Sequence, residues 1–346
     1  NKNNMKLINF IKPLSEEDYR ELQAFNYSIL KLLADNGPKS LVEKEEISGA
    51  FLEFGTLVDI LLTNPEARYN VFYTKPITKP TGNLLELCEA LYIDHIMLDK
   101  TYEDLITSEV ILEKSKSLGL WSTFKDNTIL DKVNVPIFYD YLKAKIESKG
   151  KIISSPELIE AAEHCAHVLK NHNYTKDLFI ESEDIEILTQ VPLLYNFKGY
   201  LGKAKLDLVR VDHKNKVIYP YDIKTGSELP TNFENSFYHF KYYLQAVSYM
   251  YALAYLRDQN KELEEYKIDS FKFIYISKKL PDCPVIYNVD EKLLSTFFEG
   301  WTNSKGEYVK GFKDLANEYI YYKSNEIYNA EKKVLENNGV LNITLS

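Results

Sequence analysis

The chain of 346 residues is 45% hydrophobic and 27% charged, a balance that excludes an intrinsically disordered protein and supplies a substantial core. Its formal net charge of −9 argues against a protein that coats nucleic acid indiscriminately, since nonspecific binding depends on phosphate neutralisation by Lys and Arg. A local basic channel stays compatible with this charge, and the length predicts one large domain or two closely packed ones.

The three cysteines, Cys88, Cys165 and Cys283, are widely spaced and form no Cys-X-X-Cys pair. A disulfide framework is therefore not expected, and the pattern is typical of a cytosolic protein. His164 and His167 flank Cys165 in an Ala-rich helical segment, where ordinary packing is a better interpretation than a metal site. No window approaches the roughly 18 to 20 apolar residues of a membrane span, so we expect a soluble, cytoplasmic protein.

The first half of the chain, to about residue 180, is predicted to be mostly helical. An amphipathic helix is expected over residues 14–34, ended by the Asn-Gly-Pro run at 36–38. A second is expected over residues 47–63, where Pro65 stops it. Further helices are predicted at 84–92, 102–118, 137–149 and 156–171.

From about Ile185 the apolar pattern changes to the two-residue period of strands. Residues 186–193 form the first predicted strand. Residues 200–211 and 217–224 also alternate, and the polar residues between them predict a β-hairpin with Lys214 and Asn215 at its tip.

The register of this hairpin brings two acidic residues together. Asp207 falls directly opposite Asp222, with Cβ atoms roughly 4.5–5.5 Å apart. Because side chains alternate along a strand, Lys224 lies on the same face, while Tyr221 and Ile223 point to the other face.

Two unpaired carboxylates held this close repel each other, and a hard divalent cation with oxygen ligands is the usual relief. Mg²⁺ is the natural candidate. An adjacent lysine ammonium can position or deprotonate a water, or stabilise charge on a phosphate, which are the tasks of metal-assisted phosphodiester hydrolysis. An Asp-X-Lys sequence on a strand is nevertheless common and, taken alone, is more often structural.

A helix is predicted over residues 236–256, after the hairpin, with a second stripe formed by Tyr242, Gln245 and Tyr249. Its apolar stripe, expected to face the core, comprises Phe237, Phe240, Leu244, Val247, Tyr251 and Tyr255. The predicted elements that follow are a strand at 267–277, a loop at 278–284, a strand at 285–289 and one or two helices within 309–337.

The hairpin, the Asp-X-Lys strand and the helix with Gln-X-X-X-Tyr resemble the PD-(D/E)XK nucleases of the RecB-like branch, and among them the phage-type exonucleases related to RecE and YqaJ. The resemblance implies that Asp207 and Asp222 bind the metal and that Lys224 is catalytic. It also implies that Gln245 and Tyr249 support the site and the DNA.

Three further metal ligands are candidates through the same resemblance. The carbonyl of Ile223 is a family-type ligand. Asp59 stands where the family has a His, and it is either on the wet face of its helix or aimed at the metal. Gln190 stands where the family often has a Glu, and Glu186 would substitute for it only if the register is shifted.

The implied fold is α/β: a restriction-endonuclease-like core, with a small mixed sheet flanked by helices and a helical N-terminal region. We expect a helical region packed on the core at 1–180, the nuclease core at 181–300 and a helical closing segment at 301–346. The implied cofactor is Mg²⁺, with Mn²⁺ as a substitute. The branch that holds an iron-sulfur cluster with four cysteines is disfavoured, because this chain has three.

The expected activity is Mg²⁺-dependent exonucleolytic hydrolysis of DNA from its ends, in phage-type recombination or DNA processing. About 180 residues of helix precede the sheet and could roof the cleft so that only a strand end enters. The alternatives are an endonuclease on the same core, or a non-catalytic DNA-binding or phage structural protein. The expected partners are DNA, a single-strand annealing recombinase and further copies of this chain, in the host cytoplasm if the protein is phage-encoded.

Overall fold

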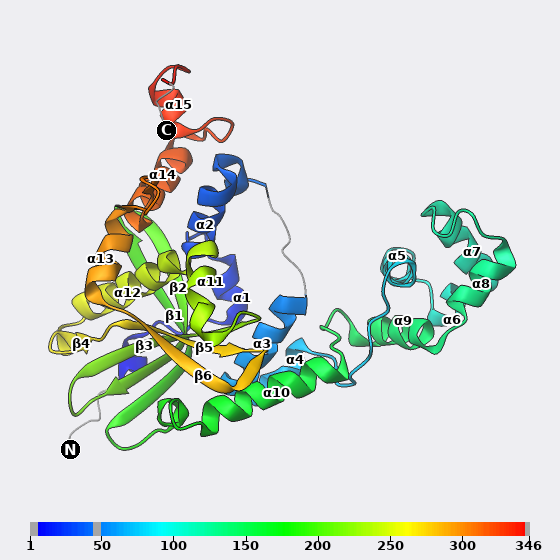
Figure 1. Cartoon of the computed structure of the whole chain (residues 1–346), viewed down its shortest axis with the longest axis horizontal. Coiled ribbons are helices and arrows are strands. Elements are labelled where there is room, and N and C mark those ends of the chain that lie inside the picture. The colour runs from blue at the N-terminus through cyan, green and yellow to red at the C-terminus, as the bar shows by residue number, and fades with distance from the viewer. Residues whose placement is uncertain (1–5, 44–49, 343–346) are drawn as a thin grey trace. The chain divides into compact units, whose positions relative to one another are not determined.

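The computed structural model describes residues 6–43 and 50–342. Its contacts divide the chain into two compact units (Figure 1). The first, which we call the sheet unit, comprises Asn1–Ser48 and His167–Ser346. The second, the helical unit, comprises Gly49–Ala166. This division differs from the predicted boundary at about residue 180, because the N-terminal segment belongs with the sheet.

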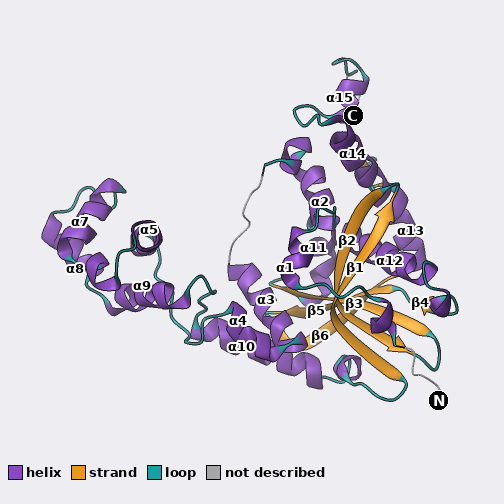
Figure 2. Ribbon diagram, turned by 180° about the vertical axis from the view of Figure 1, so that it is seen from behind, coloured by secondary structure: helices purple, strands orange, loops and turns teal. Residues whose placement is uncertain are grey.

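A six-stranded mixed sheet forms the centre of the sheet unit (Figure 2). Its strands, in spatial order, are β1 (Ile185–Phe197), β2 (Tyr200–Asp212), β3 (Val217–Gly226), β5 (Phe271–Ser277) and β6 (Leu280–Val289), and β4 (Lys267–Ile268) pairs with β3. Strand β3 runs parallel to β4 and β5, whereas the other neighbours are antiparallel. The predicted α/β class with a small mixed sheet flanked by helices is therefore confirmed.

Helices cover this sheet and supply part of its core. They are α1 (Glu16–Glu21), α2 (Tyr27–Asn36), α11 (Phe233–His239), α12 (Tyr242–Asp258), α13 (Glu291–Glu299), α14 (Phe312–Asn325) and α15 (Lys332–Glu336). Helix α12 contacts β1 and β2, and it also packs against α2, α13 and α14. Its buried residues, among them Leu244 and Leu253, lie in the same hydrophobic cluster as Leu206 and Phe273 of the sheet.

The helix predicted over residues 14–34 is wrong as a single element, because it is interrupted at Phe25. This residue is fully buried and pairs with β2 through its backbone. Its N–H donates to the carbonyl of Leu201 at 3.1 Å, and its carbonyl accepts from the N–H of Lys203 at 2.8 Å. The side chain of Asn26 then caps α2 by accepting from the N–H of Ile29 at 2.9 Å.

Two residues of β2 hold this N-terminal segment in place. Lys203 is only 7% exposed, and its ammonium donates to the carbonyls of Tyr19 at 2.8 Å and Leu22 at 3.0 Å. Gly202 lies under the ring of Tyr195 from the neighbouring strand, and a Cβ there would meet the ring carbon Cε2 at 2.2 Å. Only glycine fits beneath that ring.

Three further predictions in the second half need correction. The strand predicted over 267–277 is two strands, β4 and β5. The helix predicted over 236–256 is divided into α11 and α12 by Lys241, which has a φ of +53°. The predicted loop at 278–284 is a tight hairpin, and β6 already begins at Leu280. Pro281 and Pro284 are tolerated within β6 because it is an edge strand, where unbonded N–H positions are allowed.

The helical unit has a hydrophobic core of its own, which includes Leu87, Leu91, Phe138 and Leu142. Its helices are α3 (Ala50–Thr63), α4 (Arg68–Val71), α5 (Asn83–Leu98), α6 (Tyr102–Leu105), α7 (Ser108–Ser117), α8 (Asp126–Val133) and α9 (Pro136–Ser148), and α10 (Pro156–Asn171) crosses the unit boundary. The predicted helix at 102–118 is two helices, since Thr107 caps the second, and α8 was not predicted. Residues 47–49 of the predicted second helix lie outside the described residues.

Within the described ranges, no helix combines the length and the apolar character that a membrane crossing requires.

Candidate active site

The hairpin of β2 and β3 has the predicted register, with Leu208 paired to Tyr221. Hydrogen-bonded pairing of the two strands ends at this position, one residue before Asp207 and Asp222 would pair. Beyond it, a carboxylate oxygen of Asp207 accepts from the N–H of Ile223 at 2.9 Å. The two strands therefore part at the predicted site, and a side chain satisfies the backbone donor that the ladder leaves free.

Strand β1 is irregular opposite Asp207. Leu188 and Val191 both pack on the same core, although residues three apart on a regular strand face opposite sides. Gln190 between them has a φ of +49°, which reverses the alternation, and the facing stretch of β2 shows the same shift. The amide Nε2 of Gln190 lies 3.4 Å from Asp207 Oδ1. Backbone strain of this kind is concentrated at functional sites.

Asp222 is 1% exposed and is contacted by two charged or polar partners. The amide of Gln245 on α12 donates to Oδ1 at 2.6 Å, and Lys224 Nζ lies 2.6 Å from Oδ2. Oδ2 nevertheless has no hydrogen bond of good geometry, and the buried Gln245 Oε1 likewise has none. Two buried oxygens in this site thus have lone pairs to offer a further ligand.

The charges of the site are strongly coupled. Burial and the nearby Asp207 raise the pKa of Asp222 well above its ordinary value, and Lys224 acts in the opposite direction. Burial would lower the pKa of Lys224, but the carboxylate of Asp222 outweighs it, and the net shift is upward. Lys224 is therefore held as an ammonium, which can stabilise negative charge but is a poor base.

Aromatic rings surround the lysine. Lys224 Nζ lies 4.6 Å from the ring centroid of Tyr242 and 5.9 Å from that of Phe273. Tyr249 accepts a hydrogen bond at 3.1 Å from the amide of Gln245, and the rings of Tyr249 and Tyr27 meet edge to face at 5.8 Å. The predicted stripe of α12 does face the strand that carries Lys224.

Tyr27 is a residue of this cluster that the sequence did not reveal. It opens α2, and its pKa is raised by burial, with Lys224 lowering it and Asp222 raising it. Its hydroxyl therefore lies within the electrostatic range of the site. Helical periodicity placed Tyr27 in a helix but carries no information on which distant strand that helix meets, so no signal in the sequence marked this residue.

The oxygen donors that meet here fit a hard divalent cation. They are the carboxylates of Asp207 and Asp222, whose charges interact. The carbonyl of Ile223 and the side chain of Gln190, whose amide nitrogen lies 3.4 Å from Asp207 Oδ1, are the further candidates that the resemblance implies. Over the described part of the chain, no group of three or more His, Cys, Asp or Glu residues could hold a metal. Two carboxylates with an amide and a carbonyl match Mg²⁺, which keeps several waters, better than they match a transition metal.

Two candidate metal ligands from the sequence remain, Glu186 and Asp59. Glu186 is not a substitute ligand, because its buried carboxylate accepts from the N–H of Leu7 at 2.7 Å and from that of Ile8 at 3.2 Å, and lies 2.9 Å from His213 Nε2. Its role is to fasten the N-terminal turn to β1. Asp59 belongs to α3 in the helical unit, and its role as a ligand stays a prediction.

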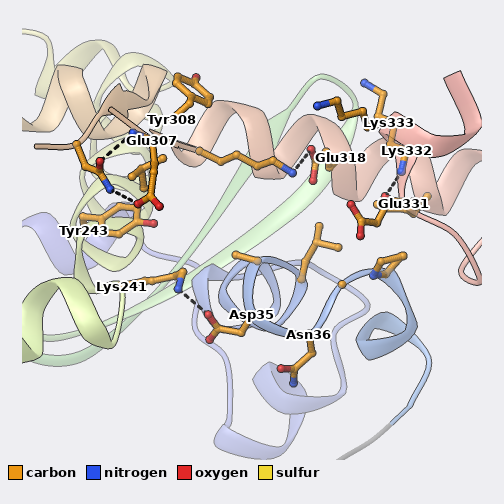
Figure 3. Close-up of a pocket in the computed structure, with 18 residues that line it drawn as sticks. Asp35, Asn36, Lys241, Tyr243, Glu307, Tyr308, Glu318, Glu331, Lys332 and Lys333 are labelled. Carbon is orange, nitrogen blue, oxygen red and sulfur yellow. Dashed lines mark hydrogen bonds and ion pairs between the residues drawn. The ribbon is translucent and has the colours of Figure 1, made fainter. Parts of the chain in front are cut away.

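A wide cavity lies elsewhere in the sheet unit, at the C-terminal end of α2 (Figure 3). It has a volume of about 920 Å³, and none of the predicted site residues lines it. Its walls carry ion pairs, with Lys241 2.6 Å from Asp35 and Lys310 2.6 Å from Glu318. The cavity is thus wide and lined by charges of both signs, and it contributes nothing to the chemistry of the carboxylates.

Comparison with known proteins gives matches to solved structures alone, of which two are described. No family model matches the chain, and no curated protein does. A crystal structure described as "Putative exonuclease" from Eubacterium rectale is similar over 97% of both chains, with 13% identity and a TM-score of 0.47. A crystal structure of a protein named SSO0001 matches 69% of this chain and 85% of its own, with 17% identity and a TM-score of 0.22. The function of this chain is accordingly argued from its own site residues.

Proposed function

We propose that this protein is a Mg²⁺-dependent deoxyribonuclease of the PD-(D/E)XK superfamily, similar to the phage-type exonucleases of the RecB-like branch, that hydrolyses DNA from its ends. One observation carries the proposal. Asp207, Asp222 and Lys224 converge where β2 and β3 part, and Gln245 of α12 is hydrogen-bonded to Asp222. These are residue types that metal-assisted phosphodiester hydrolysis uses, and their order along the chain is the one on which the resemblance rests.

Each residue has a chemical role in this proposal. Asp207, Asp222 and the carbonyl of Ile223 would hold the Mg²⁺, with Gln190 beside them. The metal, when bound, supplies a Lewis acid and an activated water. The ammonium of Lys224 is placed to stabilise charge that develops on the phosphate, and Gln245 orients Asp222. Tyr249 holds the amide of Gln245 in that orientation.

The biological setting we propose is phage-type recombination or DNA processing. DNA is the substrate, Mn²⁺ is the expected substitute for Mg²⁺, and a single-strand annealing recombinase is the expected partner. A homo-oligomer would suit a nuclease that encloses a DNA end. The net charge of −9 fits this design, because an enzyme that captures ends gains little from sequence-independent binding along a duplex.

The test compares a covalently closed circle with the same DNA linearised, in single- and double-stranded form, with Mg²⁺ and with chelator. Degradation of the linear form to nucleotides, with the circle intact and no activity in chelator, is the expected result. Nicking of the circle at a comparable rate would favour the endonuclease alternative. Absence of cleavage in every form would favour a non-catalytic DNA-binding protein, and the conservative variant Asp222→Asn is the inactive control.

A further inference from the structure

The break between α11 and α12 presents aromatic rings to solvent beside the candidate active site. Helix α11 ends at His239, and Phe240 follows it before Lys241 reverses the backbone with its φ of +53°. Phe240 is 38% exposed, and the ring of His239 meets its ring edge to face at a centroid distance of 4.7 Å. Single exposed phenylalanines are common on protein surfaces, so a function for this ring is inferred from the residues that it contacts.

The ring of Phe240 is linked to Lys224 through the ring of Tyr242. Its centroid lies 5.7 Å from that of Tyr242, with an angle of 32° between the two planes. Tyr242 in turn lies under Lys224 Nζ at 4.6 Å. A series of aromatic rings therefore leads from solvent at Phe240 to the ammonium at Lys224, and the ring of Phe233 stacks on that of Tyr242 at 6.0 Å.

We propose that Phe240, backed by Tyr242 and edged by His239, is a stacking platform for an unpaired nucleobase at the end of the DNA. This inference rests on the proposed nuclease function and specifies its substrate: a terminal nucleotide that is already unpaired. Every nucleobase has a π-face, so an aromatic platform binds DNA ends without regard to sequence. A base paired within a duplex stacks on its neighbours and does not offer this face.

The position of the platform suits the chemistry. A base stacked on Phe240 would place its sugar and phosphate toward Tyr242 and Lys224, since these residues continue the path into the site. The platform would then orient the terminal nucleotide, while the carboxylates act on the adjoining phosphodiester. Phe240 is thus a substrate-binding residue, and the loss of its ring should affect only substrates that carry a base at that place.

The test measures hydrolysis of short single-stranded oligodeoxynucleotides in Mg²⁺. One substrate has natural bases throughout, and two others carry an abasic residue at the 5′ or the 3′ terminus. We expect Phe240→Ala to lower kcat/KM on the natural substrate about 10-fold. The same variant should cleave one of the abasic substrates as well as the wild type does, and Phe240→Trp should keep the preference for the natural end.

Tyr238→Ala is the matched control, because Tyr238 is also an exposed ring of α11 but packs toward Trp301 and Phe297. It should cleave all three substrates like the wild type. An equal loss on natural and both abasic substrates in Phe240→Ala, or no loss on any, would overturn the platform and leave the nuclease intact. Failure of the wild type to cleave any of them, while it degrades linear duplex DNA, would overturn the platform and leave the proposed function intact. Failure on linear duplex DNA as well would overturn the proposed function.

Discussion

At the scale of single residues, the site holds two carboxylates, those of Asp207 and Asp222, close enough to repel each other. Burial and Asp207 both raise the pKa of Asp222, so the site as folded stores repulsion. In Asp207→Asn, the amide oxygen can still accept from the N–H of Ile223, but the repulsion is gone. We expect the metal-free variant to be at least as heat-stable as the wild type and about 10²-fold or more slower in DNA hydrolysis.

Thermal unfolding in chelator and the linear-DNA assay check this pair of outcomes. A lower melting temperature of metal-free Asp207→Asn would mean that the carboxylate is structural, and full activity would remove it from the site.

Lys224 offsets the buried charge of Asp222, so its removal should affect stability as well as rate. We expect Lys224→Met to cut cleavage about 10²-fold or more and to cost about 3 kcal/mol of unfolding free energy at pH 7. Without the ammonium, the folded-state pKa of Asp222 stays above its ordinary value of 3.8. A carboxyl group whose pKa is raised by folding stabilises the protein at pH values below its ordinary pKa. This stabilisation is lost as the pH rises through the folded-state pKa.

The difference in stability between Lys224→Met and the wild type should therefore shrink as the pH is lowered from 7 toward 4. Denaturant titrations of both proteins across that range measure it. A difference independent of pH would show that the loss comes from packing of the lysine stem instead of from the charge.

A substitution at Tyr27 can separate an effect on catalysis from an effect on packing. Tyr27→Phe keeps the edge-to-face contact with Tyr249 and removes only the hydroxyl near Lys224. We expect an unchanged melting temperature and a fall in kcat of about 10-fold, with little change in KM. Tyr251→Phe is the control, because that hydroxyl donates to the carbonyl of Asn196 on the edge strand, away from the carboxylates. Equal activity of both variants would limit Tyr27 to packing.

At the scale of elements, two non-glycine residues with left-handed backbone lie in β1 and in the turn that follows it. Gln190 has a φ of +49° within the strand, and Lys198 has a φ of +52° in the turn to β2. Glycine at either position removes a strain of about 1 kcal/mol, partly offset by backbone entropy. We expect Gln190→Gly and Lys198→Gly both to match or exceed the wild type in melting temperature, and only Gln190→Gly to lose activity.

The control in this comparison is Lys198→Gly, whose side chain reaches Asn317 and not the carboxylates. Loss of activity in both variants would point to the shape of β1 instead of the amide of Gln190.

The elements that were predicted correctly from the sequence are those that neighbouring residues in the sequence determine. The register of β2 and β3 followed from alternation and a polar tip, and with it the convergence of Asp207 and Asp222. The breaks in the two helices were not predicted, because the apolar spacing continues through both of them. Backbone pairing with β2 interrupts the first helix at Phe25, and a left-handed residue interrupts the second at Lys241. The left-handed Gln190 was not predicted either, since it interrupts the pairing of β1 with β2, and the sequence of β1 carries no signal of that interruption.

At the scale of the whole molecule, the two compact units each contain one tryptophan, Trp121 in the helical unit and Trp301 in the sheet unit. Each unit also has its own hydrophobic core, so each can report its own unfolding. We expect Mn²⁺ at 100 times its dissociation constant to stabilise the transition seen by Trp301 by about 2.7 kcal/mol. The transition seen by Trp121 should not move.

The single-tryptophan variants Trp121→Phe and Trp301→Phe separate the two signals in denaturant titrations. An equal shift of both transitions would indicate that the metal acts on the chain as one cooperative unit, and would bring Asp59 of the helical unit back into consideration.

The close approach of Gly202 to the ring of Tyr195 has a consequence for how this protein can diverge. Ala at 202 would collide with the ring, so position 202 is constrained for as long as position 195 is aromatic. A smaller residue at 195 would release that constraint and leave room for a Cβ opposite. Among descendants of this chain, positions 195 and 202 should thus change together, with aromatic-glycine pairs replaced by aliphatic-alanine pairs and mixed aromatic-alanine pairs absent.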